Sequence, residues 1–124
     1  TKYREGRILI AGDAAHINNP LGGMGMNFGF HDAFNLTDKL NQIWFNNASE
    51  ELLDKYERQR KTVASEYLQA QSIENKKNLE RKNQTDREKF FDELRGIASD
   101  DKKQRNYLRR VAMIEGVERA ASIS

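Results

Sequence analysis

The chain has 124 residues, of which 21 are basic and 19 are acidic, so its formal net charge is +2. It contains no cysteine, which excludes a disulfide framework, a thiolate metal site and a thiol nucleophile. It also lacks an apolar run of about 18 residues and the apolar core of a secretory signal, so the sequence favours a cytoplasmic protein without a membrane span.

Charge divides the chain into two regions. Residues 1–49 carry eight charged side chains, whereas residues 50–124 carry 32, and six of the eight glycines lie near the start of the chain. We therefore expect two parts with different roles, residues 1–48 and residues 49–124. In the second part positive and negative charges alternate, which is typical of solvated helix surface and not of a nucleic-acid-binding face.

The first expected element is a short strand at residues 7–11, Arg-Ile-Leu-Ile-Ala. Its continuous apolar run is typical of a strand buried on both faces. Gly12 and Asp13 end it, and the glycines, asparagines and single proline of residues 13–25 indicate a loop. A buried strand needs hydrogen-bonding neighbours, and the sequence offers no second strand. We therefore expect the chain to be a fragment whose partner strands precede it.

Helical patterning begins near Gly23 and continues to about Phe45. Met26, Phe30 and Phe34 lie at helical spacing and predict an apolar stripe on this helix.

A longer helix is predicted from an N-cap at Ser49 to about Glu80. Leu52, Tyr56 and Val63 lie on its expected apolar face. The charged residues between them are expected to face water; they are Lys55, Glu57, Arg58, Arg60 and Lys61.

Two further helices are expected in the second half of the chain. Thr85 or Asp86 would open the first, which Gly96 would stop, and Asp100 or Asp101 would start the last. The predicted fold of the isolated chain is therefore mostly α, with one buried strand, a glycine-rich loop and three to four helices.

The segment that carries chemistry runs from Gly12 to Asn27. An aspartate at the end of a strand can accept hydrogen bonds from hydroxyl groups, and glycines let a ligand approach the backbone. The free amides at a helix start offer donors to an anion. This is a pattern for a polyhydroxylated, electron-rich ligand. The pattern is not the dinucleotide fingerprint, because Phe28 stands where a third glycine is required.

The two histidines do not indicate a metal site. His16 and His31 lie 15 positions apart, with no carboxylate or histidine at the spacing of metal ligands. We expect His16 to pack or to hydrogen-bond, and we predict no metal.

Taken together, Gly12–His16, the glycine loop after Pro20, and Asp32-Ala33-x-Asn35-Leu36 resemble the second flavin-binding motif of class A FAD-dependent aromatic monooxygenases, the para-hydroxybenzoate hydroxylase-like family. The segment from Leu52 to Arg60 also resembles the family's next helix. This resemblance covers about half of the chain and implies a parent α/β FAD-binding fold of which the chain is a C-terminal fragment.

The resemblance also implies site residues. Asp13 would hydrogen-bond the ribityl chain of FAD, and the Pro20 backbone would lie near the reacting flavin ring and the substrate, as the catalytic position. The remaining cofactor-binding residues would contact the flavin mostly through the backbone; they are Gly12, Gly22, Gly23, Met24, Gly25, Met26 and Asn27.

The implied activity is hydroxylation of an aromatic or heteroaromatic substrate with NAD(P)H and dioxygen. By itself the chain is expected to be inactive and to associate, either with a missing N-terminal FAD-binding region or with a second copy. Two alternatives remain open: another flavoprotein oxidoreductase or epoxidase of the same superfamily, and a stand-alone helical interaction module.

Overall fold

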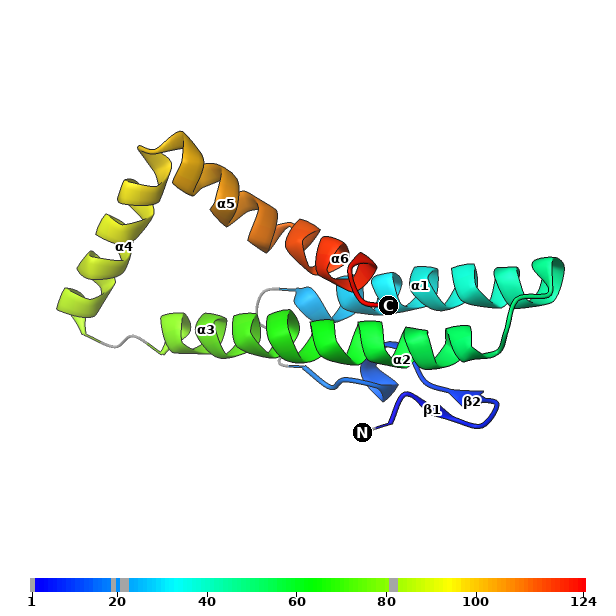
Figure 1. Ribbon diagram of the computed structural model, residues 1–124. Helices are drawn as coiled ribbons and strands as arrows, with labels where there is room; N and C mark the ends of the chain where they lie inside the picture. The colour runs from blue at the N-terminus through cyan, green and yellow to red at the C-terminus, as the bar shows by residue number, and fades with distance from the viewer. Residues whose placement is uncertain (1, 19, 21–22, 81–82) are drawn as a thin grey trace.

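The computed structural model describes residues 2–18, 20, 23–80 and 83–124, and these residues are mostly helical (Figure 1). The chain begins with an antiparallel pair of strands, β1 (Arg4–Glu5) and β2 (Ile8–Leu9), followed by the 3-10 turn η1 (Gly12–Ala14). The later elements are α1 (Met24–Asn46), α2 (Glu51–Val63), the π-helical segment η2 (Ala64–Gln69), α3 (Ala70–Leu79), α4 (Gln84–Ala98), α5 (Asp101–Val111) and α6 (Ile114–Ala121). None of the helices in the described ranges has the length and apolar character needed to cross a bilayer.

The prediction of a strand buried on both faces at residues 7–11 is wrong. Strand β2 pairs with β1 of the same chain, with Arg4 opposite Leu9, and the Ile8 side chain is 72% exposed. Gly6 adopts the left-handed conformation, with φ of 60°, that lets the chain reverse between the two strands. The hairpin supplies a partner within the chain, so this segment does not by itself require partner strands from elsewhere.

Helix α1 lies alongside one continuous helical rod formed by α2, η2 and α3 (Figure 1). The rod confirms the helix predicted from about Ser49 to Glu80, and the Ser49 hydroxyl accepts the amide of Glu51. Helices α4 and α5 then turn back, and α6 returns to pack against α2. The main core joins residues from both composition regions: Met24, Phe28, Val63, Ala64, Leu68, Met113 and Ala120.

Two predicted helix boundaries in the second half differ from the structure, and a third agrees with it. Asn83, rather than Thr85 or Asp86, caps α4, because its side chain accepts the Asp86 amide at 2.7 Å. Gly96 lies inside α4 and does not end it. Asp100 caps α5 as predicted.

The last predicted helix is broken by Met113. This residue has a φ of 61° and is buried in the core, so α5 ends at Val111 and α6 begins at Ile114. The helical spacing of apolar residues continues through this point, but the buried Met113 adopts a left-handed conformation that ends the helix.

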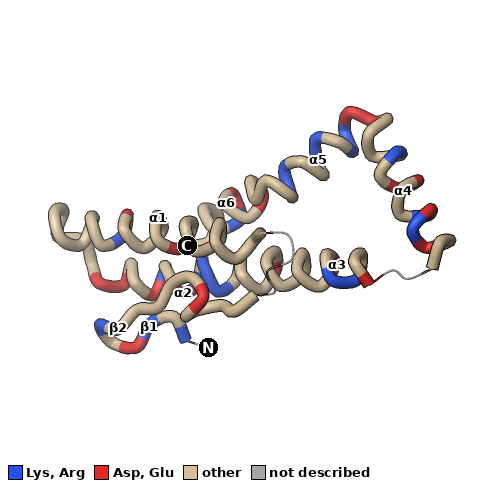
Figure 2. The backbone as a smooth tube through the Cα atoms, turned by 180° about the vertical axis from the view of Figure 1, so that it is seen from behind, with Lys and Arg blue, Asp and Glu red and all other residues tan. Residues whose placement is uncertain are grey.

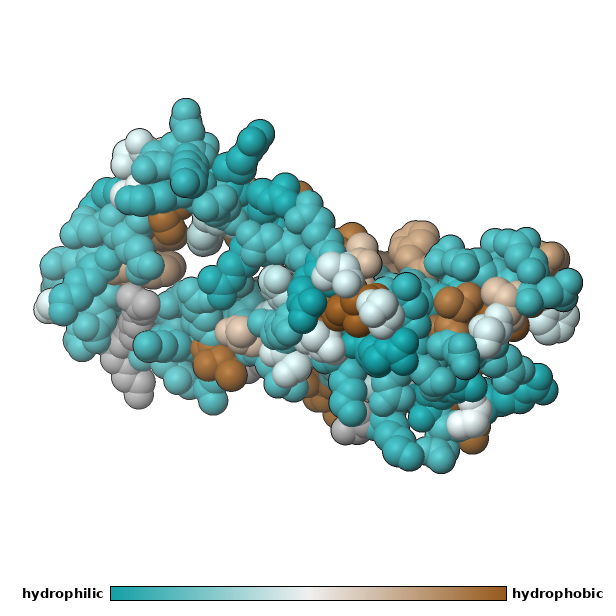
Figure 3. Space-filling view, in the orientation of Figure 1, coloured by the Kyte–Doolittle hydropathy of each residue, from teal (hydrophilic) through white to brown (hydrophobic). Residues whose placement is uncertain are grey.

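The predicted apolar stripe on α1 lies on the exposed side of the described chain. Met26, Phe30 and Phe34 are 70%, 55% and 76% exposed, whereas Met24 and Phe28 face the core. Figure 3 shows brown and tan patches along this helix, and Figure 2 shows few charged residues on it compared with α2 to α5. The side of α1 that faces the core is therefore the one that carries Met24 and Phe28, and not the predicted stripe.

Candidate functional site

The turn that carries Asp13 is built on a glycine. Ala11 is extended, Gly12 has a φ of 63°, and the amides of Ala15 and His16 donate to the Gly12 carbonyl at 2.9 and 3.0 Å. The Asp13 side chain is exposed on this turn. The turn therefore presents a carboxylate to solvent from a backbone conformation that favours glycine.

The beginning of α1 lies next to this carboxylate. A Cβ atom placed on Gly25, in the first turn of α1, would lie 3.7 Å from Oδ1 of Asp13. Gly23 precedes the helix in the left-handed conformation, donates its amide to the Pro20 carbonyl at 3.1 Å, and provides no side-chain cap. The Asn27 side-chain amide donates to the Gly23 carbonyl at 3.1 Å. First-turn amides that lack an intrahelical partner therefore lie beside an exposed carboxylate.

Two glycines let the turn approach the helix closely. A Cβ atom on Gly29 would lie 3.4 Å from the Cα atom of Gly12, and one on Gly12 would lie 3.7 Å from the Cα atom of Gly29. The backbone of η1 therefore packs directly on the backbone of α1, with no side chain between them.

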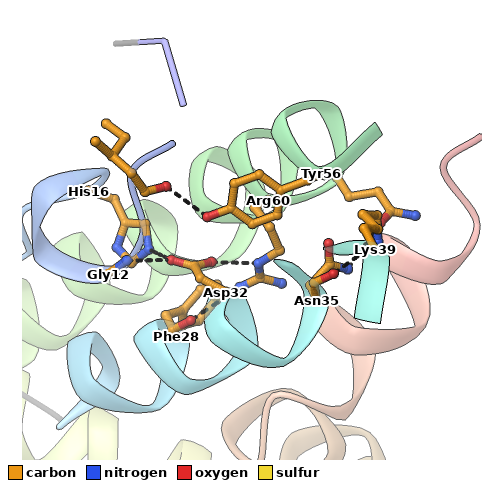
Figure 4. Close-up of polar contacts among 10 residues, drawn as sticks. Gly12, His16, Phe28, Asp32, Asn35, Lys39, Tyr56 and Arg60 are labelled. Atoms are coloured by element: carbon orange, nitrogen blue, oxygen red, sulfur yellow. Dashed lines mark hydrogen bonds and ion pairs between the residues drawn. The ribbon is translucent and has the colours of Figure 1, made fainter. Parts of the chain in front are cut away.

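A buried polar network lies directly beneath the turn (Figure 4). The Asp32 carboxylate is 0% exposed and accepts three hydrogen bonds. Its Oδ2 accepts the Gly12 amide at 2.8 Å and Nε2 of His16 at 2.5 Å, and its Oδ1 accepts Nε of Arg60 at 2.6 Å. Arg60 also lies over the Phe28 ring, 5.6 Å from its centroid, and is 1% exposed. One carboxylate thus joins η1, α1 and α2.

The surroundings of Asp32 keep it ionised. Burial alone would raise the pKa of this carboxyl, but hydrogen bonds from His16 and Arg60, the Arg60 charge and the Gly12 amide together hold the pKa below its ordinary value. Against an ionised Asp32, His16 donates from Nε2, and its Nδ1 has no hydrogen-bond partner among the described residues. His16 is therefore a hydrogen-bonding residue, as its isolated position in the sequence predicted.

Two tyrosines close the network on the side of the hairpin. Tyr56 donates its hydroxyl to the Ile10 carbonyl at 2.8 Å, and Tyr3 packs against both Tyr56 and His16. Burial raises the pKa of Tyr3 to about 12 and also raises the pKa of Tyr56, so both hydroxyls stay protonated. Both rings shield the Asp32–Arg60 pair from water, which strengthens the electrostatic attraction within it.

The structure brings several of the predicted site residues together. Gly12, Asp13, Gly23 and Gly25 lie around the junction of η1 and α1, and Pro20 joins them through its carbonyl. The Met24 side chain is buried in the core, so only its backbone is available to a ligand. Gly22 lies outside the described residues.

Two of the predicted residues have exposed side chains at this end of α1. Met26 is 70% exposed, and the Asn27 side chain is turned back onto the backbone by its bond to Gly23.

The interpretation of the sequence missed the role of the Asp32–Arg60 pair. Arg60 was expected to face water with its charged neighbours, and this prediction is wrong. A signal was present, because Asp32 stands in a segment with few charges and Arg60 ends the second stretch that resembles the flavoprotein family. The periodicity of the helix alone could not pair them, since they lie 28 positions apart.

Comparison with known protein families agrees with this geometry. The model of an FAD-binding domain family matches residues 1–71, more than half of the chain. The chain belongs to the FAD-binding domain family. The matched range contains η1, the start of α1 and the Asp32–Arg60 pair, and FAD is the cofactor for which this family is described.

The relatives of this FAD-binding chain are monooxygenases. It is 36% identical over 87% of its length to 6-hydroxy-3-succinoylpyridine 3-monooxygenase of Pseudomonas putida, and it covers 28% of that protein. It is 46% identical over 56% of its length to pentachlorophenol 4-monooxygenase of Sphingobium chlorophenolicum, of which it covers 13%. The resemblance to class A FAD-dependent aromatic monooxygenases is thereby confirmed, and the chain spans less than a third of these relatives.

A solved structure shares the fold of the FAD-binding chain. The crystal structure of p-nitrophenol 4-monooxygenase from Pseudomonas putida superposes with a TM-score of 0.82 at 28% identity. The match covers 94% of this chain and 29% of the other. The mostly helical arrangement of Figure 1 is therefore also found as part of a longer monooxygenase chain.

The described residues fit FAD in the chemistry of their donors and acceptors. The Asp13 carboxylate can accept hydrogen bonds from ribityl hydroxyls, and the first-turn amides of α1 can donate to an electron-rich ring edge. Gly25 leaves the space beside Asp13 free of a side chain. The junction therefore offers both an acceptor and donors to one ligand.

Proposed function

We propose that this chain forms part of the FAD site of a monooxygenase that hydroxylates an aromatic or heteroaromatic substrate with NAD(P)H and dioxygen. The observation that carries the proposal is the exposed Asp13 carboxylate beside the open N-terminus of α1, in a chain of the FAD-binding domain family. The relatives named for pyridine and phenol substrates support an aromatic or heteroaromatic substrate.

In this proposal each part of the junction has its own role. Asp13 holds the ribityl chain, the backbone of residues 22–26 faces the pyrimidine edge of the flavin, and Asn27 supports the first turn of α1 through its bond to Gly23. Pro20 contributes its backbone near the reacting ring and the substrate. Residues 1–48 then form the flavin-contacting part, and residues 49–124 form a helical region that supports it.

FAD supplies the redox and oxygen chemistry of this reaction, and the chain supplies position and electrostatics. The N-terminus of α1 carries the positive end of the helix dipole, which favours negative charge on the part of the ligand that it faces. The amides are fixed by the helix before the ligand arrives, so they stabilise this charge with little reorganisation.

Replacing Asp13 by alanine tests the proposal. In the full-length protein the Asp13→Ala variant should bind FAD about ten- to a hundredfold more weakly, because a hydrogen bond to a charged group contributes about 1.5–3 kcal/mol. Titration of the apoprotein with FAD, followed by flavin fluorescence, measures the change. Asp92→Ala is the matched control, since the Asp92 side chain is also exposed and hydrogen-bonded, to Arg95 on α4, away from the η1–α1 junction. Equal FAD affinity of the Asp13→Ala variant and the wild type would count against the assignment.

The exposed apolar face of α1 supports a proposal about the rest of the domain. Phe34, Trp44 and Phe45 are 76%, 79% and 74% exposed, and they line a hollow of about 740 Å³ at the C-terminal half of the helix. The chain covers 28% and 13% of the two monooxygenase relatives named above, so each of them is a much longer chain. We propose that this face is covered by the remaining part of the FAD-binding domain.

The single tryptophan of the chain reports on this face. Trp44 is 79% exposed, so the isolated 124 residues at low concentration should show red-shifted emission and strong quenching by acrylamide. In the full-length protein the Trp44 contribution, obtained by difference from a Trp44→Phe variant, should be blue-shifted and protected. Protection of the isolated chain that disappears on dilution would instead identify a second copy as the occupant. Equal quenching in both proteins would contradict coverage of the face.

A further inference from the structure

The Asp32 carboxylate sits at the meeting point of three elements. It belongs to α1, it accepts the backbone amide of Gly12 from the η1 turn, and it accepts Nε of Arg60 from α2 (Figure 4). It is 0% exposed, and Arg60 is 1% exposed. A buried ion pair is costly to desolvate, and apolar side chains of similar volume can often replace the whole pair without loss of stability. Its position beneath the η1 turn therefore needs a reason beyond stability.

The Asp32 carboxylate is hydrogen-bonded to Gly12, the residue that precedes Asp13. Because Asp32 accepts the Gly12 amide, it fixes the peptide plane from which the Asp13 residue continues. Where Gly12 packs on Gly29 the two backbones meet with no side chain between them. In the described residues, the polar links from the Gly12 amide and from the His16 side chain to α1 both end on Asp32.

The same link sets the position of the turn along the helix. Asp32 lies two helical turns after Gly25, a distance of about 10 Å along the axis. Asp13 reaches Gly25 at one end, while Gly12 is bound to Asp32 at the other. A shift of the turn along α1 would change the spacing between the Asp13 carboxylate and the open amides of the first turn.

We propose that Asp32 is a positioning residue for the FAD site, which acts through the Gly12 amide to hold Asp13 at a fixed spacing from the N-terminus of α1. Arg60 keeps the Asp32 carboxylate charged and oriented, and His16 occupies the second lone pair of Oδ2. Asp32 itself is too deeply buried to touch the ligand. The inference rests on the proposed function, because it assigns a role within that same site.

Two substitutions in the full-length protein separate charge from position. Asp32→Asn keeps the shape of the side chain but offers one oxygen instead of two, so Arg60 and Gly12 must compete for it. Asp32→Glu keeps the charge paired with Arg60 but displaces the oxygens from Gly12. Both variants should bind FAD about tenfold more weakly, because loss of the Gly12–Asp32 hydrogen bond lets Asp13 move and so weakens its own hydrogen bond to the ligand. Both should also alter the visible circular dichroism of bound flavin, which reports on its surroundings.

Gln59 provides a matched control for a merely structural effect. It lies next to Arg60 on α2, is 4% exposed, and is hydrogen-bonded to Asn35 and to the Ile123 carbonyl, away from η1. Gln59→Leu should lower the unfolding midpoint but leave both the FAD affinity and the flavin spectrum unchanged. Arg60→Lys retains the positive charge beside Asp32, so the flavin spectrum of this variant should stay close to that of the wild type.

The outcomes distinguish this inference from the proposed function. Weaker FAD binding with a changed flavin spectrum in a folded Asp32 variant, against an unchanged Gln59→Leu spectrum, supports the positioning role. If Asp13→Ala weakens FAD binding while folded Asp32 variants bind as the wild type does, only the positioning role fails. If neither Asp32 variant folds, Asp32 is a core residue and the positioning role is overturned. If the full-length wild type does not bind FAD, the proposed function fails.

Discussion

Replacing Arg60 by alanine should lower the free energy of unfolding by about 3–5 kcal/mol, the cost of leaving one member of a buried ion pair without its partner. Asp32, which is 0% exposed in the wild type, would then have only the Gly12 amide and His16 as donors among the described residues. Urea unfolding, followed by far-ultraviolet circular dichroism, measures the loss. Arg119→Ala is the control. The Arg119–Glu66 pair is exposed, so water replaces Arg119 beside Glu66 and the free energy of unfolding should change little.

The pH dependence identifies the cause of this loss. In the wild type the pKa of Asp32 is held below its ordinary value, so the pair contributes stability above the pKa of an unfolded aspartate, about 3.9. This contribution is lost as the pH falls through the folded-state pKa. Without Arg60, burial becomes dominant and raises the pKa of Asp32. The difference in the free energy of unfolding between the wild type and Arg60→Ala should therefore become smaller as the pH falls.

A double variant gives the complementary result. Adding Asp32→Asn to Arg60→Ala removes the unpaired charge, so part of the lost stability should return, and the two substitutions should be non-additive. Additive losses across the double-mutant cycle would contradict the direct coupling between the two side chains that the 2.6 Å contact implies.

The helices of this chain follow from local patterns, and the exceptions have tertiary causes. The Asp100 cap and the long rod of α2 to α3 could be predicted, because capping and helical spacing are properties of neighbouring residues. The break at Met113 could not be predicted, because it depends on a core that α6 completes with distant residues. The hairpin was missed because a two-residue strand carries too short a pattern to read.

The exposed residues of the site could be predicted from the sequence, but the buried ion pair beneath them could not. The glycines and Asp13 could be assigned because turn chemistry and family resemblance both act on a short segment. Arg60 was placed on the wrong face, because charge normally predicts exposure and the pairing that reverses this rule comes from Asp32, on another helix. The apolar stripe of α1 was found correctly in the sequence, but it does not face the core. No described residue of the chain covers it.

Gly29 provides the second large expected effect, since it lies where two backbones meet. A Cβ atom at this position would already lie 3.4 Å from the Gly12 Cα atom, so the two γ-methyl groups of valine would push the η1 turn away from α1. Gly29→Val should destabilise the protein by about 1–3 kcal/mol, the usual cost of overpacking. It should also weaken FAD binding, because the Gly12–Asp32 hydrogen bond cannot survive this displacement.

The same substitution at Gly96 separates packing from helix propensity. Gly96 lies inside α4, and a Cβ atom there would meet nothing within 4 Å. Because valine has a better helix propensity than glycine, Gly96→Val should stabilise the protein by a few tenths of a kcal/mol and leave FAD affinity unchanged. Denaturant unfolding and FAD titration of the two variants in parallel test the difference. Equal effects at both positions would mean that the backbone contact between Gly12 and Gly29 does not hold the Asp13 turn on α1.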